Sequence, residues 1–265
     1  VQAAAFYNVT MQPFRGLQLS LGSNIAMGVH RGTQVGLLAN VVSGSMRGLQ
    51  VGGYNYADTL TGSQVGLINV ALEHPHGVQV GLVNYTHDTR AKKIGLVNIN
   101  PSTLIDVMAF GGSNTAANMA LRFRNRSTYN IIGVGSPYVG FDGHFSGALY
   151  YRLGQYFRLN DRWSLSGDIG YAHIESFEES SQQRPNRLFS LQARLNADYQ
   201  INRHLGVFAS VGYANTRYYH HQQHYKDELI VEGGLAIRWN HRPDPYTPGT
   251  RATTDTTGHV PLGQW

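Results

Sequence analysis

The chain has 265 residues, a formal net charge of +5 and no cysteine. Without cysteine, disulfides, thiolate catalysis and thiolate metal ligands are excluded. Lys and Arg are scattered without a basic run, which argues against nucleic-acid binding. No stretch approaches the ~18 consecutive apolar residues of a membrane-spanning helix.

A first barrel strand is predicted at 5–12, within an opening segment of residues 1–15. The prediction depends on a count of strands. Seven strands predicted later in the chain need an eighth, because single-chain barrels of the bacterial outer membrane have an even number of strands. With eight strands, both ends of the barrel chain lie on the periplasmic side.

Residues 16–115 form a block built on the phrase G-x-Q-V-G-L-x-N. Clear copies begin at Gly32, Gly62 and Gly77, and looser ones begin at Gly16 and Gly48. The glutamines in these copies, at 18, 34, 50, 64 and 79, recur every 14–16 residues. A fixed short period indicates one structural unit stacked on itself.

Polar connectors of similar length separate the copies, at 43–45, 57–59, 73–75 and 87–89. Antiparallel strands would place successive connectors at opposite ends, where they should differ. Similar connectors therefore favour a parallel β-solenoid with one coil per repeat, in which side-chain amides stack as ladders. The asparagines of the predicted ladder are Asn40, Asn55, Asn69, Asn84 and Asn98. The alternative makes each repeat a membrane strand, which gives a barrel of about 12 to 14 strands.

Residues 116–240 contain long runs in which apolar and polar residues alternate. The pattern predicts strands at 117–124, 128–137, 144–158, 163–176, 187–201, 205–219 and 227–239. Runs of about ten residues or more match membrane-spanning β-strands. A soluble β-sandwich is the alternative, but its strands are usually about 5–6 residues long.

Short turns at 160–162 and 202–204 alternate with long polar loops at 175–187 and 217–227. Outer-membrane barrels have short turns on the periplasmic side and long loops outside the cell. We therefore predict an all-β fold: an outer-membrane antiparallel β-barrel of about eight strands with an inserted β-solenoid-like repeat block. The block would lie between the first two strands, on the extracellular side. Residues 241–265 are predicted to be a flexible periplasmic tail.

The repeat is followed by the segments 129–135, Y-N-I-I-G-V-G, and 145–152, F-S-G-A-L-Y-Y-R. Together these resemble a family of bacterial surface-repeat outer-membrane β-barrel proteins, known mainly from Bacteroidota-like and spirochaete-like genomes. The resemblance covers nearly the whole chain. It implies location in the bacterial outer membrane and this architecture, and it implies no activity.

The predicted strand register points charged side chains into the barrel. They are Arg122, Arg124, Arg152, Arg158, Arg194 and Arg238, with Asp168, Asp198 and Glu232. An eight-stranded barrel is just wide enough to be filled by its own side chains. A plug of ion pairs is therefore predicted, and an anion-selective path is the alternative.

Three histidines in a predicted loop, His220, His221 and His224, are candidate metal ligands, because neutral imidazole suits Zn and Cu. No metal site is predicted from them, since the only nearby carboxylates are Asp227 and Glu228.

A His-x-Ser pair, His144 and Ser146, is similar to that of lipid A deacylase, an enzyme built on an eight-stranded outer-membrane barrel. A hydrolase also needs a carboxylate that orients the histidine, and the rest of this strand has none. No catalytic residue is therefore predicted. His173, Glu175 and Glu178 are interpreted as residues of the surface rim.

These patterns predict a non-enzymatic structural or interaction protein without a cofactor, either an accessory subunit of an envelope complex or a surface-binding component. Stacked repeats make broad, rigid faces that suit binding. The expected partners are outer-membrane lipid and lipopolysaccharide, and a protein in the same membrane. A small porin-like channel and a membrane-embedded hydrolase of the deacylase type are the alternatives.

Overall fold

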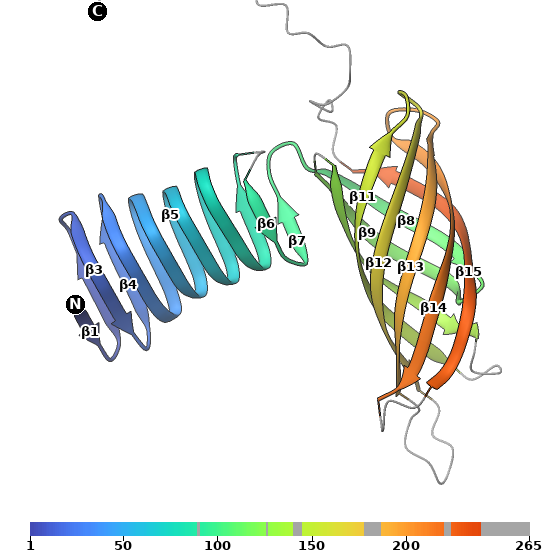
Figure 1. Cartoon of the computed structure of the whole chain (residues 1–265), viewed down its shortest axis with the longest axis horizontal. Helices are drawn as coiled ribbons and strands as arrows, with labels where there is room; N and C mark the ends of the chain where they lie inside the picture. Colours follow the sequence, from blue (N-terminus) through green and yellow to red (C-terminus); the bar gives the residue numbers. More distant parts are fainter. Residues whose placement is uncertain (89–90, 126, 140–144, 178–186, 220–223, 240–265) are drawn as a thin grey trace, which may run out of the picture.

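Two β-structures follow one another along the chain in the computed structural model, which describes residues 1–88, 91–125, 127–139, 145–177, 187–219 and 224–239. The first is a parallel β-solenoid, and the second is a closed antiparallel barrel that begins at Leu104 (Figure 1). Within the described ranges, the chain contains no helix with the length and apolar character of a membrane span.

The solenoid is built from parallel pairs throughout. Its strands are β1 (Gln2–Ala4), β2 (Tyr7–Thr10), β3 (Phe14–Ser20), β4 (Ser23–Met27), β5 (His30–Thr86), β6 (Lys92–Ile94) and β7 (Val97–Ile99). Strand β5 runs unbroken through several coils. Equivalent repeat positions pair across neighbouring coils, as Gln18 with Gln34 and Asn24 with Asn40. The predicted solenoid is therefore confirmed, and the alternative of repeats as antiparallel membrane strands is wrong.

Two amide ladders share the interior of the solenoid with a buried apolar cluster, which consists of Ala26, Val42, Met46, Ala57, Leu60 and Ala71. Each ladder glutamine donates to the glutamine of the preceding coil, as in the bond of 2.8 Å from Gln34 Nε2 to Gln18 Oε1. The asparagines run the other way, and Asn69 Nδ2 donates to Asn84 Oδ1 at 2.8 Å. The coils are so close that a Cβ added at Gly66 would lie 2.0 Å from the Gly52 carbonyl oxygen. The repeated glycine is therefore required by the stacking of the coils.

The prediction of a first barrel strand within residues 1–15 is wrong. These residues form the first coil of the solenoid, in which β1 pairs with β3 and β2 pairs with β4, both in parallel. Only Gln2 and Asn8 keep the ladder positions of the repeat, so the first coil lacks the recognisable phrase. An alternating stretch such as 7–10 has the same pattern in a coil and in a barrel strand.

The eighth barrel strand is β8 (Leu104–Gly112), inside the range predicted as the repeat block. It follows the solenoid and pairs with β9 (Thr115–Arg124) and with the last strand, β15 (His224–Arg238). Its sequence, L-I-D-V-M-A-F-G-G, is apolar at most positions on both faces. Alternation is therefore weak in β8, and the strand was not recognised.

The remaining strands close the barrel in the order β10-β11-β12-β13-β14-β15-β8-β9. They are β10 (Thr128–Tyr138), β11 (Ser146–Arg158), β12 (Trp163–Ser176), β13 (Arg187–Gln200) and β14 (Leu205–Tyr218). All pairs are antiparallel, and the single sheet closes on itself through the pairing of β8 with β15, which excludes the two separate sheets of a β-sandwich. The predicted register is confirmed, because Leu195 and Val211 are exposed on the outer wall and Ser210 is buried.

The solenoid joins the barrel at the end where the strand connections are short. Those connections are 125–127, 159–162 and 201–204. At the opposite end are the strand ends that flank the three longest connections, at Tyr138, Ser176 and Tyr218, together with the short turn 113–114. The prediction that the repeat block is inserted between the first two strands, on the side of the long loops, is therefore wrong. The block precedes the whole barrel and enters it at the start of β8.

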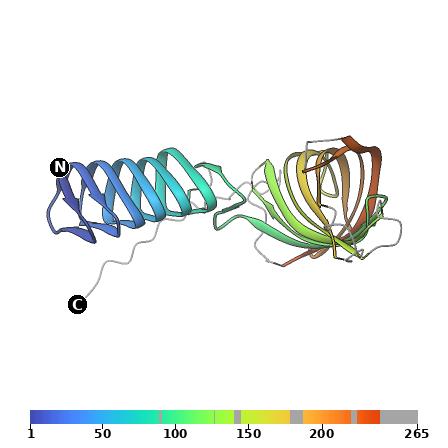
Figure 2. The ribbon, with the colours of Figure 1, turned by 90° about the horizontal axis from the view of Figure 1, so that it is seen from below.

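Polar contacts hold the last coil of the solenoid against the barrel. Asn98 Nδ2 donates to Asn130 Oδ1 at 3.2 Å, and the Tyr151 hydroxyl donates to the Gly95 carbonyl at 3.0 Å. Asn100 Nδ2 donates to Asn125 Oδ1 at 3.1 Å. The asparagine ladder therefore ends on β10, and the solenoid extends sideways from the barrel with its axis across that of the barrel (Figures 1 and 2).

Candidate functional site in the barrel lumen

Charged side chains meet inside the barrel in two clusters. The first, near the short connections, is centred on Asp106, which is 2% exposed. Its carboxylate lies 3.0 Å from Arg122, 2.8 Å from Arg124 and 3.3 Å from Arg238. Arg122 also contacts Asp198 at 2.7 Å. Two carboxylates therefore face three arginines in this cluster.

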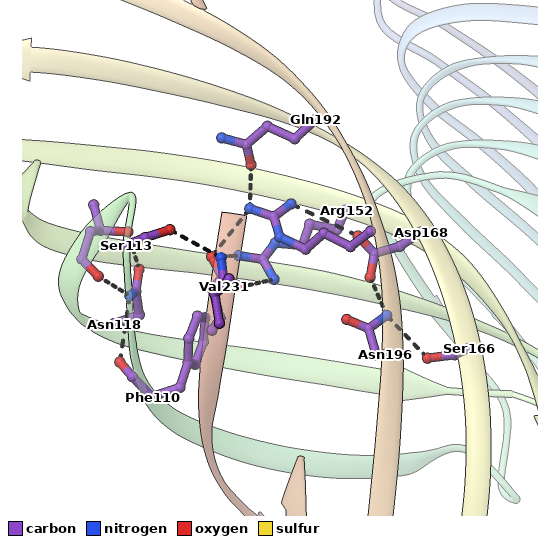
Figure 3. A network of polar contacts seen from close by, with 12 residues as sticks. Phe110, Ser113, Asn118, Arg152, Ser166, Asp168, Gln192, Asn196 and Val231 are labelled. Atoms are coloured by element: carbon purple, nitrogen blue, oxygen red, sulfur yellow. Dashed lines mark hydrogen bonds and ion pairs between the residues drawn. The ribbon is translucent and has the colours of Figure 1, made fainter. Parts of the chain in front are cut away.

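The second cluster lies further along the lumen and is centred on Glu232. Both oxygens of Glu232 accept hydrogen bonds from Arg152, at 3.0 and 3.2 Å, and one also accepts from Arg194 at 3.2 Å. Arg194 lies 3.9 Å from Asp168 and donates to Gln192 Oε1 at 2.6 Å. Figure 3 shows Arg152, Asp168 and Gln192 of this cluster, which converge from different strands. Two carboxylates here balance two arginines.

Neutral groups complete the second cluster. The Tyr129 hydroxyl and Asn196 Nδ2 each donate to Asp168 Oδ2 at 2.9 Å, and Asn196 also donates to Ser166 at 3.2 Å. These hydrogen bonds satisfy Asp168 Oδ2, whereas Asp168 Oδ1 and Arg194 Nη1 lie 3.9 Å apart without a hydrogen-bond partner among the described residues. Hydrogen bonds to the carboxylate offset part of the cost of burying the ion pair.

The lumen is apolar toward the end with the long connections. Ile174, Leu188 and Ile230 are fully buried, and Tyr138 is 2% exposed and donates to Glu228 at 3.2 Å. At the opposite mouth, a cavity of about 20 Å³ remains among residues that include Asp106, Arg122 and Arg162. That volume has room for about one water molecule. The two charged clusters and the buried residues of the other end therefore place side chains across the described lumen, as expected for a plug.

The centre of the first cluster was missed from the sequence. Asp106 lies in β8, which was taken as part of the repeat block, so its inward direction was not considered. The available signal was charge balance, because the predicted inward set had six arginines and only three carboxylates. Arg158 lies at the end of β11 and is half-buried.

Of the candidate metal ligands, His224 is described, and His220 and His221 lie outside the described residues. His224 Nε2 lies 3.0 Å from Asp227 Oδ2, on an exposed part of β15. Among the residues that the structure describes, no group of three or more His, Cys, Asp or Glu side chains is placed to hold a metal ion.

Of the His-x-Ser pair, Ser146 is described, and His144 lies outside the described residues. The Ser146 hydroxyl is buried and accepts a hydrogen bond of 2.9 Å from the backbone N–H of Tyr138. Glu175 lies 3.6 Å from His173 and 2.7 Å from Arg187, which form an ion-pair group at the rim. Glu178 lies outside the described residues.

The chain is similar to a solved structure of another β-barrel. No family model matches the chain, and no curated protein matches it. The crystal structure of the N-terminal β-barrel domain of Pseudomonas aeruginosa OprF is similar to 51% of this chain and 97% of its own, with 13% identity and a TM-score of 0.37. The resemblance to a surface-repeat family stays a prediction.

Proposed function

We propose that this chain is a non-enzymatic structural component of the bacterial outer membrane, in which a plugged barrel anchors the solenoid. The observation that carries the proposal is the combination of a filled lumen with an apolar outer wall. Leu153, Ile169, Leu195, Val211 and Leu235 are all exposed on that wall. A barrel with this polarity matches a lipid-facing band around a polar interior.

The orientation of the barrel follows from its connections. The short ones belong on the periplasmic side of an outer-membrane barrel. The solenoid joins the barrel at this end, so we assign it to the periplasmic side. The stacked coils offer a broad, rigid surface, and we propose that it contacts membrane lipid and a protein partner of the envelope.

Ion conductance tests the plug. Full-length protein reconstituted in planar bilayers should show no conductance above that of protein-free bilayers, because two ion-pair clusters and an apolar layer fill the lumen. Insertion is checked separately on gels, where a closed barrel migrates differently before and after boiling. Steady single-channel currents from inserted protein would support a small channel instead and would contradict the anchor.

A further inference from the structure

One edge of the solenoid exposes a line of large apolar side chains. Each coil turns twice, and at one of these corners stand Phe6, Leu21, Leu37, Leu67 and Leu82, which are 48–79% exposed. We call this corner line the apolar edge. The valines beside it, such as Val65, also point outward and are partly exposed. Exposed apolar residues of this number and order indicate an interaction surface.

Apart from Lys93, which takes the ladder position next to Gln79, the described charged residues of the coils lie toward the opposite edge. Lys, Arg, Asp and Glu are absent from the corner segments 3–8, 19–24, 35–40, 51–55, 65–69, 80–84 and 94–98. The charges of the coils, including Arg15, Arg31, Arg47, Asp58 and Glu73, lie toward the other corner, which we call the polar edge. The solenoid is therefore amphipathic across its width.

The interior of the coils is polar beside the apolar edge. Gln34, Asn40, Gln64 and Asn69 are fully buried and bonded within their ladders. Buried apolar side chains lie in the other half of the coils, where Val42, Met46 and Leu60 belong to a fully buried cluster. In lipid, the polar groups of a protein must be hydrogen-bonded within the protein, because no water is available. The ladder amides beneath the apolar edge meet this requirement.

The attachment to the barrel sets the direction of the two edges. Gly95, at the apolar edge of the last coil, contacts Tyr151 on the outer wall of β11, whereas Asn100 contacts Asn125 in a short connection. The apolar edge therefore points along the wall toward the long connections. In Figure 1 the coils lie beside the barrel wall and not beyond its end. A bilayer around the barrel would meet the solenoid.

We propose that the apolar edge is inserted among the acyl chains of the periplasmic leaflet, while the polar edge remains in water. From the corner at Leu37, the next outward-facing residues along the strand are Val35, Thr33 and Arg31. At about 3.3 Å per residue, the first polar residue, Thr33, lies about 13 Å from the corner, and the first charged residue, Arg31, lies about 20 Å from it. Interfacial protein segments insert to a depth of about 5–10 Å. The inference depends on the proposed membrane location of the barrel.

Lipid is the occupant that fits the whole edge. The edge continues the apolar outer wall at Tyr151, so one lipid phase can cover both surfaces. It carries no charge and exposes no described backbone edge between coils, because successive coils are paired.

Single-cysteine spin labels test the inference, because the chain has no native cysteine. Full-length Leu37→Cys and Leu67→Cys report on the apolar edge, and Arg47→Cys and Thr61→Cys report on the polar edge. Leu195→Cys on the barrel wall and Asp161→Cys in a short connection calibrate lipid and water. Collision rates with oxygen and with a water-soluble nickel chelate are measured in phosphatidylethanolamine–phosphatidylglycerol vesicles.

Insertion predicts that labels at 37 and 67 collide more with oxygen than with the chelate, as at 195, and that labels at 47 and 61 show the reverse, as at 161. Chelate access at 37 and 67, with lipid values at 195, would overturn the inference and leave the proposed function intact. Low access to both reagents at 37 and 67 would indicate a protein cover and would also overturn it. Water values at 195 would contradict the membrane location itself.

Discussion

Glu232 holds two buried arginines in the lumen, and its replacement by Gln is the most direct test of the plug. The carboxylate lies 3.0 Å from Arg152 and 3.2 Å from Arg194. Glu232→Gln keeps the volume of the side chain and one acceptor oxygen but removes the negative charge. Asp168, at 3.9 Å from Arg194, is then the remaining carboxylate in contact with the pair.

The expected loss of barrel stability is large. At an effective dielectric constant of 20, each arginine attracts the carboxylate by about 5 kcal/mol before desolvation is subtracted. Breaking a buried pair from one side costs about 3–5 kcal/mol, because a charge is left without a partner. We expect Glu232→Gln near the lower value, since the amide oxygen still accepts a hydrogen bond, and Glu232→Ala near the upper value.

Urea unfolding in lipid vesicles measures this loss, with the folded fraction read from unheated gels. The control is Asp227→Asn, on the same strand, where the carboxylate is 41% exposed and its partner His224 is 54% exposed. The control should cost less than about 1 kcal/mol. The double variant Glu232→Gln/Arg152→Met should recover most of the loss, because it removes the unpaired arginine. Equal costs for Glu232→Gln and Asp227→Asn would refute the role of the cluster.

Three further predictions concern the outer wall and the ladders. Leu195→Arg should destabilise the barrel in vesicles by about 2–4 kcal/mol if the site is near the bilayer midplane, and a cost equal to that of Ser210→Arg inside the lumen would mean that the wall does not face lipid. Asn69→Ala should lower the free energy of unfolding of the solenoid by about 2–5 kcal/mol, because Asn84 Oδ1 and the Val80 carbonyl lose their donor. Hydrogen exchange of the solenoid amides measures this loss. Asn8→Ala in the first coil should lower the free energy of unfolding less. Burial lowers the pKa of Lys93 to about 8, so the folded solenoid disfavours the charged amine, and its stability should rise as the pH increases from about 8 toward the ordinary lysine pKa. Lys93→Gln should abolish that pH dependence and supply a donor for Gln79 Oε1, which has no hydrogen-bond partner.

The fold could be predicted where the sequence has a regular period, either the repeat of 14–16 residues in the solenoid or the alternation of apolar and polar residues in the barrel strands. The repeated glutamine and asparagine predict parallel coils because only stacking brings like amides together at every period. In the barrel, alternation assigns each residue to the lumen or the outer wall. Alternation therefore predicts Leu195 on the outer wall and Ser210 in the lumen, and their exposure and burial confirm both positions.

The connection of the two parts could not be predicted, because the strand count is insensitive to which segment supplies the eighth strand. A strand at 5–12 and a strand at 104–112 give the same even number. The two choices place the solenoid at opposite ends of the barrel. In β8 the lumen side includes Met108 and Phe110, which are as apolar as the lipid side, so alternation fails there. Asp106 was missed for the same reason.

Asn130 explains how the two parts are joined. It is the one ladder asparagine supplied by the barrel, on the outer wall of β10, where neighbouring outward positions such as Ile132 and Val134 are apolar. An uncovered amide at this place would be costly in lipid. Asn130 is instead 2% exposed and bonded to Asn98. The solenoid and the barrel therefore follow one rule, with polar groups paired inside or at the joint and apolar groups outside, and this shared polarity is the reason to place both against the same membrane.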